Sequence, residues 1–253
     1  MLTGILAPMP EEIELIIEHM TVESVYESGR RKFYKGKLNG QDCVVALSRI
    51  GKVASSVTAA VMIEHFKIDR LIVTGVAGGI ASHLKLGDVV VASDCVQHDL
   101  DARPFFPQFE APLLDKAFFP CDPALSEKAL SSCKAFLEND FHTYISQEDV
   151  EAFSLFSPKV YYGQLCCGDQ FIGSEAQLLK IKNELPDTLC VEMEGGAVGQ
   201  VCYEYNIPYA VIRTISDSAN DHAPIDFALY IQNVAKYYTL GLILRILHVE
   251  QKI

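Results

Sequence analysis

The sequence lacks the features that mark several large protein classes. It has no long run of Lys or Arg and a formal net charge of −12, so nucleic acid is not expected as a partner, because phosphate binding needs clustered basic side chains. No uninterrupted apolar stretch is long enough to cross a bilayer. The first residues lack the basic start and apolar run of a signal peptide. We therefore expect neither membrane insertion nor secretion.

Cysteine is present, but not in an arrangement that binds metal. The eight cysteines are scattered, with no Cys-x-x-Cys pair, and several lie in apolar, strand-like runs. We expect buried free thiols in a reducing cytoplasm. His98, Asp99 and Asp101 are close in sequence, but a His and two Asp at this spacing on a Pro-rich loop are too few for a metal site. No metal is therefore expected.

Alternating strand and helix patterns run along the whole chain. With 253 residues, 49% of them hydrophobic, a single α/β domain over residues 1–253 is expected. Such alternation predicts a mostly parallel central sheet with helices on both faces. Asn39-Gly40 predicts a tight hairpin. The expected strands are 2–7, 31–38, 42–48, 71–74, 88–96, 160–167 and 209–214, and the expected helices start at Glu11 and cover 51–66, 124–138, 175–185 and 227–248.

Two carboxylates follow the ends of expected strands. Glu194 lies in Val191-Glu-Met-Glu194, where a strand gives way to a helix, and Asp217 follows Ser216 at the end of the strand that carries Arg213. Ligands of open α/β sheets bind beyond the carboxyl ends of strands, so both acids are candidates for substrate binding and proton transfer. Taken singly, each acid is also typical of a helix N-terminus or a turn. The pair with its surroundings favours a functional site.

Three further motifs follow strands at the same expected edge. Gly75-Val-Ala-Gly-Gly79 permits a close approach of backbone to a ligand or serves only as a tight turn, and it does not match a dinucleotide-binding pattern. Glu12 is placed to activate a water, although glutamate is common in the first turn of any helix. Gly168-Asp-Gln-Phe-Ile172 offers an aromatic platform for a flat base, although Phe at a strand end is more often part of the core.

Residues 99–123 differ from the rest of the chain. They contain five prolines and five phenylalanines with almost no periodicity. Polar loops carry few aromatic residues, so this segment is expected to cover a ligand mouth, a partner subunit or both. The alternative is a loop that packs only on itself.

The ordered set of motifs resembles the purine nucleoside phosphorylase/uridine phosphorylase superfamily, and within it the branch of 5′-methylthioadenosine/S-adenosylhomocysteine nucleosidases. The resemblance covers nearly the whole chain. It is carried by Met9–Glu12, Ile50-Gly-Lys-Val-Ala54, the glycines at 75–79, Gly168-Asp-Gln-Phe, Val191-Glu-Met-Glu194 and Arg213-Thr-Ile-Ser-Asp217. The resemblance implies a three-layer α/β/α sandwich with a mixed central sheet, a homodimer, no cofactor, and hydrolysis of the N-glycosidic bond of adenine nucleosides.

The resemblance also implies roles for individual residues. Asp217, held by Ser216, would protonate adenine N7, and Glu12, with Arg213 nearby, would deprotonate the attacking water. Glu194 would bind the ribose hydroxyls. The remaining implied contacts are Met193 under the sugar, Ala77 and Gly78 beside it, Phe171 and Ile172 on the adenine, and Met9, Ile50 and Phe227 around the 5′-alkylthio group, closed by Phe105 and Pro112 of a partner chain.

Three positions depart from the family pattern. Val76 replaces a serine that helps to position the water in many members, Arg49 adds a charge near the cleft, and Gly195-Gly196 loosens a helix start. The substrate therefore stays open among methylthioadenosine, S-adenosylhomocysteine, 5′-deoxyadenosine and 6-amino-6-deoxyfutalosine.

Two other functions compete with hydrolysis. A phosphorylase needs a cluster of donors, usually arginines, for phosphate, and the start of this chain offers Met9-Pro-Glu-Glu instead. A non-catalytic nucleoside-binding protein would keep the fold without the activity, but Glu12, Glu194, Arg213 and Asp217 are all present. We expect a hydrolase.

Overall fold

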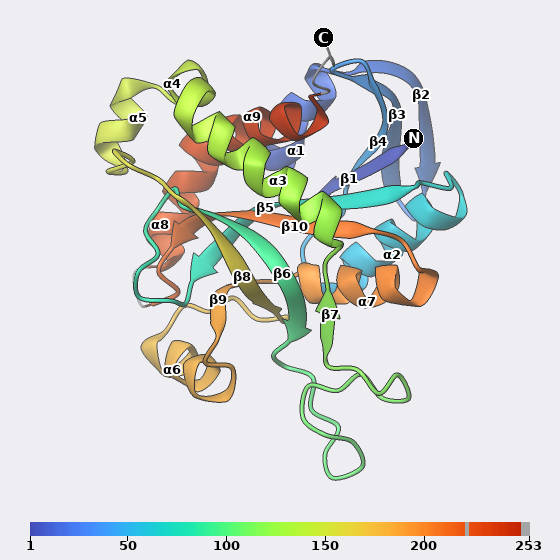
Figure 1. The fold of residues 1–253 in the computed structure, drawn as a ribbon, viewed down its shortest axis with the longest axis vertical. Coiled ribbons are helices and arrows are strands. Elements are labelled where there is room, and N and C mark those ends of the chain that lie inside the picture. Colours follow the sequence, from blue (N-terminus) through green and yellow to red (C-terminus); the bar gives the residue numbers. More distant parts are fainter. Residues whose placement is uncertain (221–222, 249–253) are drawn as a thin grey trace.

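A computed structural model describes residues 1–220 and 223–248 of the chain. Within them, all ten strands belong to one mixed sheet in the order β10-β6-β8-β9-β5-β1-β4-β3-β2, with β7 beside β6. Because β10 also pairs with β5, the strands β10, β6, β8, β9 and β5 close into a ring, and β1, β4, β3 and β2 extend from it (Figure 1). The predicted mixed sheet is confirmed, with parallel pairs concentrated around β1, β5 and β8.

The elements follow the predicted order along the chain. The strands are β1 Thr3–Ala7, β2 Thr21–Ser28, β3 Arg31–Leu38, β4 Gln41–Leu47, β5 Arg70–Gly79, β6 Val89–Gln97, β7 Phe118–Pro120, β8 Val160–Cys167, β9 Thr188–Glu192 and β10 Tyr209–Asp217. The helices are α1 Pro10–Glu18, α2 Lys52–Glu64, α3 Pro123–Ala135, α4 Phe141–Tyr144, α5 Gln147–Ala152, α6 Glu175–Glu184, α7 Gly195–Tyr205, α8 Ala223–Tyr230 and α9 Lys236–Leu247, with π-helical turns η1 at Phe136–Asp140 and η2 at Ile231–Ala235.

Helices cover both faces of the sheet, which confirms the three-layer α/β/α architecture (Figure 1). Successive strand residues face opposite layers. Ile5 packs with the cluster that contains α1, α3 and α9, whereas Leu6 packs with the cluster that contains α2 and α7. Both faces of the central strands are therefore buried, and this is why their sequences are continuous apolar runs rather than alternating ones.

The sequence predictions failed in several places. The glycines at 75–79 are the end of strand β5 rather than a loop. Strand β2 was not predicted because seven of its eight residues are exposed at the sheet edge, which removes the apolar signal of a strand. The predicted helix 227–248 is interrupted by the π-helical turn η2, and the predicted helix 124–138 gives way to the π-helical turn η1 at Phe136. Short helices α4 and α5 were not predicted.

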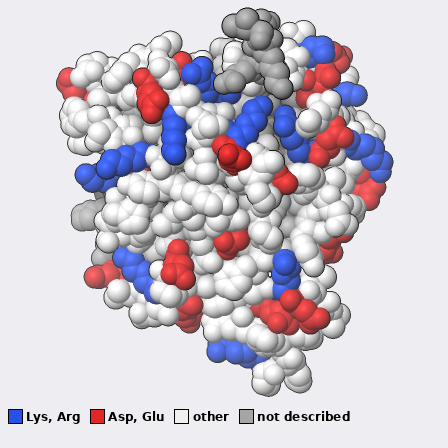
Figure 2. Space-filling model, in the orientation of Figure 1, with Lys and Arg blue, Asp and Glu red and all other residues white. Residues whose placement is uncertain are grey.

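The segment between β6 and β7 projects from the body of the protein (Figure 1). On the face shown in Figure 2, basic and acidic residues are interspersed, without a broad surface of one sign among the described residues.

None of the described helices has the length and apolar character to span a bilayer. All eight cysteines are buried and free, as predicted.

Candidate active site

A cleft of about 320 Å³ opens at the carboxyl ends of the central strands. Six strand ends supply its walls. The parallel strands β1, β4, β5 and β10 end at one edge, and the parallel pair β8 and β9 ends beside them, because β9 meets the end of β5 antiparallel, with Gly78 opposite Val191. The residues named from the sequence that line it are Met9, Glu12, Ile50, Ala77, Gly78, Phe171, Ile172, Met193, Glu194, Ser216, Asp217 and Phe227. Lining residues that sequence reasoning did not assign to the site are Pro8, Gln170, Val191 and Glu192.

Glu12 lies at the start of helix α1, fully buried at one end of the cleft. Its two carboxylate oxygens accept the backbone N–H groups of Met9, at 2.9 Å, and of Val76, at 3.0 Å. Burial raises the pKa of Glu12 to about 7, although nearby Arg213 and the two N–H groups act in the opposite direction. A buried carboxyl that changes protonation near neutral pH is suited to general-base catalysis.

Gly75 brings Glu12 and Arg213 to the same point on strand β5. Its φ of +144° lies in a region that side chains rarely adopt, and a Cβ there would stand 2.3 Å from Arg213 Nη1 and 2.8 Å from Glu12 Oε1. Only glycine therefore allows both charged groups to approach the backbone of β5. The first glycine of the 75–79 motif acts through this contact and not through a turn.

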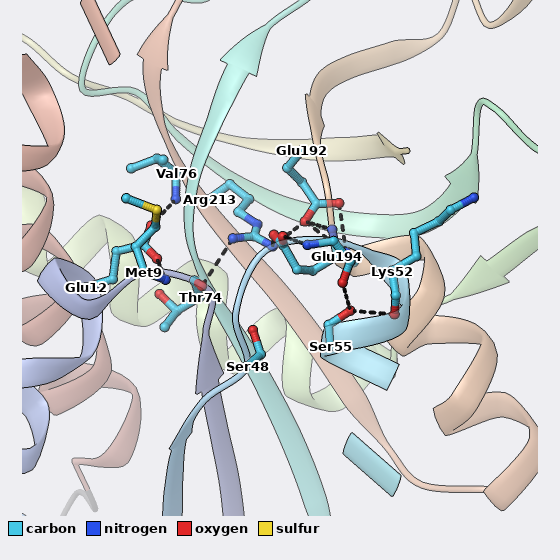
Figure 3. A network of polar contacts seen from close by, with 12 residues as sticks. Met9, Glu12, Ser48, Lys52, Ser55, Thr74, Val76, Glu192, Glu194 and Arg213 are labelled. Atoms are coloured by element: carbon cyan, nitrogen blue, oxygen red, sulfur yellow. Dashed lines mark hydrogen bonds and ion pairs between the residues drawn. The ribbon is translucent and has the colours of Figure 1, made fainter. Parts of the chain in front are cut away.

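Arg213 projects from β10 and is completely buried (Figure 3). Nη1 donates to the Thr74 carbonyl oxygen at 3.1 Å, and Nη2 forms ion pairs with Glu192 and, at 3.1 Å, with Glu194. Burial alone would lower the pKa of Arg213, but the surrounding carboxylates of Glu192, Glu194 and Glu12 raise it above its usual value. The guanidinium is therefore a permanent cation that holds several acids together.

Glu192 is the central acid that sequence reasoning overlooked. Besides its ion pair with Arg213, its carboxylate accepts the backbone N–H of Glu194 at 2.9 Å and that of Gly195 at 2.8 Å. These N–H groups begin helix α7, whose positive end favours a carboxylate. Glu192 lies three residues before the first residue of α7 and two before its N-cap, Glu194, so the usual capping rule does not point to it.

Glu194 faces the cleft and is held on two sides. Oε1 accepts the backbone N–H of Gly51 at 2.9 Å, and Oε2 pairs with Arg213. Burial and the neighbouring charge of Glu192 raise the pKa of Glu194 to about 8, against the opposing effect of Arg213. Glu192 and Glu194 thus share one arginine (Figure 3). Glu194 is held in addition by the backbone of Gly51, which follows strand β4.

Asp217 and Ser216 lie at the end of β10, on the cleft wall. The Ser216 hydroxyl donates to Asp217 Oδ2 at 2.9 Å, and the Ala219 N–H donates to Oδ1 at 2.8 Å. A Cβ on Gly78 would lie 2.9 Å from Asp217 Oδ1, so this glycine allows the acid to pack on β5. Hydrogen bonds to both oxygens therefore fix the orientation of the carboxyl.

Apolar side chains line the rest of the cleft. The Phe171 and Phe227 rings meet edge to face, with centroids 5.6 Å apart and planes at 74°. Phe171 is 43% exposed although it is aromatic, while Ile172 beside it is buried. An exposed ring at a cleft mouth has face area free for a planar ligand.

Two predicted contact residues lie outside the cleft of their own chain. Phe105 is 87% exposed and Pro112 is exposed, and neither is among the lining residues. Arg49, expected near the cleft, does not line it either: it is exposed, and its guanidinium donates to the Arg30 carbonyl oxygen at 2.5 Å. The described residues contain no group of three or more His, Cys, Asp or Glu side chains placed to hold a metal ion.

Known proteins share this architecture over their whole length. The phosphorylase superfamily model matches residues 3–247. The 5′-methylthioadenosine/S-adenosylhomocysteine nucleosidase of Aeromonas salmonicida is 33% identical over 98% of this chain and 99% of its own. The crystal structure of the nucleosidase of that name from Neisseria meningitidis, in complex with methylthio-immucillin-A, superposes with a TM-score of 0.84 at 31% identity and covers 97% of both chains.

A second kind of hydrolase has a similar structure and a similar level of sequence identity to this chain. The structure of futalosine hydrolase from Helicobacter pylori superposes with a TM-score of 0.82 at 30% identity, and again covers 97% of both chains. These matches, together with the strand-end cleft, confirm the resemblance drawn from the sequence motifs. The chain belongs to the phosphorylase superfamily and, within it, to the family of 5′-methylthioadenosine/S-adenosylhomocysteine nucleosidases.

Proposed function

We propose that this protein hydrolyses the N-glycosidic bond of 5′-substituted adenine nucleosides, with methylthioadenosine and S-adenosylhomocysteine as substrates, and releases adenine and the 5-substituted ribose. The observation that carries the proposal is that one cleft contains a buried carboxyl with a pKa near 7, Glu12, together with a second acid, Asp217, on the end of another strand. Family membership supplies the substrate class.

The reaction separates charge, and the acids match that separation. As the bond between C1′ and N9 breaks, its electron pair leaves with the base and positive charge builds on the ribose. Water then adds at C1′ and loses its proton. In our proposal Asp217 delivers a proton to N7 of the departing adenine, and Glu12 takes the proton of the water. Positioned acid and base groups each contribute on the order of 10²- to 10⁴-fold in rate.

Glu194 and Arg213 serve the ribose in this scheme. Glu194 lines the cleft and would accept hydrogen bonds from the 2′- and 3′-hydroxyls. Its carboxylate, with that of Glu192, also stabilises positive charge developing on the sugar, as carboxylates do in glycoside hydrolysis. Arg213 keeps both acids in place through its ion pairs. Met193, Ala77 and Gly78 border the sugar.

Hydrolysis is favoured over phosphorolysis by the charge of the cleft. Arg213 is buried and engaged by carboxylates, and none of the described residues that line the cleft is a Lys or Arg. Glu12 at one end would repel phosphate, and Arg49 is directed to a backbone carbonyl elsewhere. A phosphate site needs several converging donors, so water is the acceptor we propose.

The apolar part of the cleft sets the substituents that the protein accepts. We propose that adenine stacks on Phe171 and contacts Ile172, and that Met9, Ile50 and Phe227 surround the 5′ substituent. Similarity to a futalosine hydrolase favours 6-amino-6-deoxyfutalosine as a second candidate substrate, because it is also an adenine nucleoside with a bulky 5′ extension.

We further propose a homodimer in the cytoplasm. Phe105 and Leu113, on the projecting segment, are 87% and 85% exposed, more apolar surface than one short segment usually leaves in water. In a two-fold dimer Phe105 and Pro112 would close the 5′ pocket of the partner. Eight buried free thiols suit a reducing compartment.

Adenine release from each candidate nucleoside, measured with and without phosphate, tests the proposal. Equal release in both conditions is the expected result. Release that depends on phosphate would establish a phosphorylase, and binding of methylthioadenosine without release would establish a nucleoside-binding protein. Comparison of kcat/KM among methylthioadenosine, S-adenosylhomocysteine and 6-amino-6-deoxyfutalosine ranks the substrates.

A further inference from the structure

Two segments that bring residues to the cleft, at Ile50 and at 170–172, are joined to the start of the projecting segment by a closed ring of polar contacts. Lys52 Nζ donates to Asp99 Oδ1 at 2.6 Å. Asp99 Oδ2 accepts the backbone N–H of Asp169 at 2.8 Å, and Asp169 Oδ1 in turn accepts the backbone N–H of Lys52 at 2.8 Å. Each residue thus contacts both others, through side chain or backbone. We call these three residues the Lys52 ring.

The ring is not an ordinary surface ion pair. The side chains of Lys52 and Asp99 are only 19% and 17% exposed, whereas a second short Lys–Asp pair, Lys37 with Asp42, has side chains that are 47% and 54% exposed. Partial burial would raise the pKa of Asp99, but Lys52 and the Asp169 N–H outweigh it, so that pKa is lowered. Shielded pairs with several hydrogen bonds are worth more than exposed ones, which contribute little.

Two members of the ring are next to residues that face the cleft, and the third lies near the start of the projecting segment. Lys52 follows Gly51, whose N–H holds Glu194, and Ile50, which lines the cleft. Asp169 precedes the lining residues 170–172. Asp99 begins the projecting segment between β6 and β7. The Lys52 side chain itself points away from Glu194 and Arg213 (Figure 3), and no ring residue lines the cleft.

Gly51 allows the ring to close. Its φ is +98°, and a Cβ there would lie 2.9 Å from Asp169 Oδ1. The carboxylate of Asp169 therefore passes directly over the backbone of Gly51 to reach the Lys52 N–H. The same stretch of backbone donates to Asp169 on one residue and to Glu194 on the residue before it. A shift of residue 169 would move the donor of Glu194 as well.

We propose that the Lys52 ring is a positioning device for substrate binding: it sets residues 170–172, which carry Phe171, against the start of helix α2 and thereby against Glu194. The inference rests on the proposed function, because it assigns Phe171 to the base and Glu194 to the sugar. None of the three residues touches a reacting atom. Loosening the ring should therefore weaken nucleoside and adenine binding more than it slows the bound substrate.

Lys52→Met and Asp99→Asn test this, with Lys37→Met as the matched control that removes a short but exposed Lys–Asp pair. The first two variants should raise KM for methylthioadenosine and Kd for adenine about tenfold, with kcat within about threefold of wild type. Lys52→Arg, which keeps the cation, should recover most of the affinity. The control should bind and turn over like wild type. Thermal melting shows whether each variant is folded.

The ring also predicts coupling between its members. Because either substitution opens the same ring, the Lys52→Met/Asp99→Asn double variant should bind adenine no more than about twofold worse than either single variant. Folded variants that bind adenine like the control, or that lose kcat without loss of adenine affinity, would overturn the inference. A wild-type protein that neither releases nor binds adenine would instead overturn the proposed function, and the inference with it.

Discussion

The acid cluster and the projecting segment are opposites within one chain. Glu12, Glu192, Glu194 and Arg213 are at most 6% exposed, and each has hydrogen-bond or ion-pair partners that belong to other strand ends. Phe105 and Leu113, on the segment between β6 and β7, are 87% and 85% exposed. The first region is polar and buried, and the second is apolar and exposed.

The contrast indicates different kinds of role. Burying several carboxylates around one arginine is costly unless each is held by hydrogen bonds, so the acid cluster is kept for chemistry that every substrate undergoes. An exposed aromatic side chain contributes little to the stability of its own chain, and exposed apolar patches mark interaction surfaces. Substitutions in the first region should affect all substrates alike, whereas those in the second should depend on the substituent at the 5′ position.

Replacement of Asp217 by Asn should have the largest effect. The amide keeps the shape, its oxygen can still accept from the Ala219 N–H and its NH2 group can donate to the Ser216 hydroxyl oxygen, but it cannot deliver a proton to N7. We expect kcat to fall on the order of 10²- to 10⁴-fold for every adenine nucleoside, with inhibitor binding retained. Steady-state kinetics and calorimetric Kd values measure both. Activity within threefold of wild type would remove Asp217 from the mechanism.

Replacement of Glu12 by Gln should be nearly as severe, and its effect should depend on pH. Because the pKa of Glu12 is raised to about 7, kcat/KM of the wild type should rise with pH up to about 7 and then level off, as the base loses its proton. The Gln variant should bind transition-state analogues almost normally. A variant that keeps turnover and loses affinity would make Glu12 a binding residue.

The same raised pKa predicts a trend in stability. A carboxyl whose pKa is higher in the folded state than in the unfolded state stabilises the fold most below its unfolded value of about 4.5, and that stability is lost as pH rises through about 7. The melting temperature of the ligand-free wild type should therefore decrease between pH 5 and pH 8. Glu12→Gln should show a shallower decrease, and an unchanged slope would contradict the assigned shift.

These expectations also show where sequence reasoning succeeded. Apolar strands that are buried on both faces leave a clear sequence signal, and ligands bind beyond the carboxyl ends of such strands. The sequence therefore placed Glu12, Phe171, Glu194 and Asp217 at one edge, and all four line the cleft. The edge strand β2 has no such signal, since its residues are exposed on both faces.

The details of the acid cluster could not be predicted in the same way. Glu192 and Glu194 look equivalent in sequence, and only the three-dimensional path of β9 into α7 lets Glu192 accept the N–H groups at the start of α7 while Glu194 accepts the N–H of Gly51. The approach of Glu12 to Arg213 depends on Gly75, and these residues are far apart along the chain. Contacts between distant segments leave no local periodicity, so the sequence alone does not reveal the shared arginine.

Replacement of Glu194 by Gln should have an intermediate effect on both binding and turnover. One carboxylate serves the ribose in the ground state and the transition state, so KM should rise and kcat should fall, each about tenfold. The 2′-deoxy analogue is the matched control. Wild type should cleave it more slowly than the parent nucleoside, and Glu194→Gln should discriminate less between them. Equal cleavage of both by wild type would undercut the assignment.

Replacement of Phe105 by Ala should have the smallest and most selective effect. If Phe105 closes the 5′ pocket of a partner chain, its loss removes one apolar contact, worth about 1.5–3 kcal/mol when fully buried. KM should then rise about ten- to a hundredfold for methylthioadenosine and little for adenosine, whose 5′-hydroxyl makes no such contact. Leu113→Ala, at an equally exposed position of the same segment, shows whether the effect belongs to Phe105 itself. Light scattering should report a dimer for the wild type. A fully active monomer, or a Phe105→Ala protein that treats both nucleosides alike, would contradict the idea that this exposed segment completes a neighbour's site.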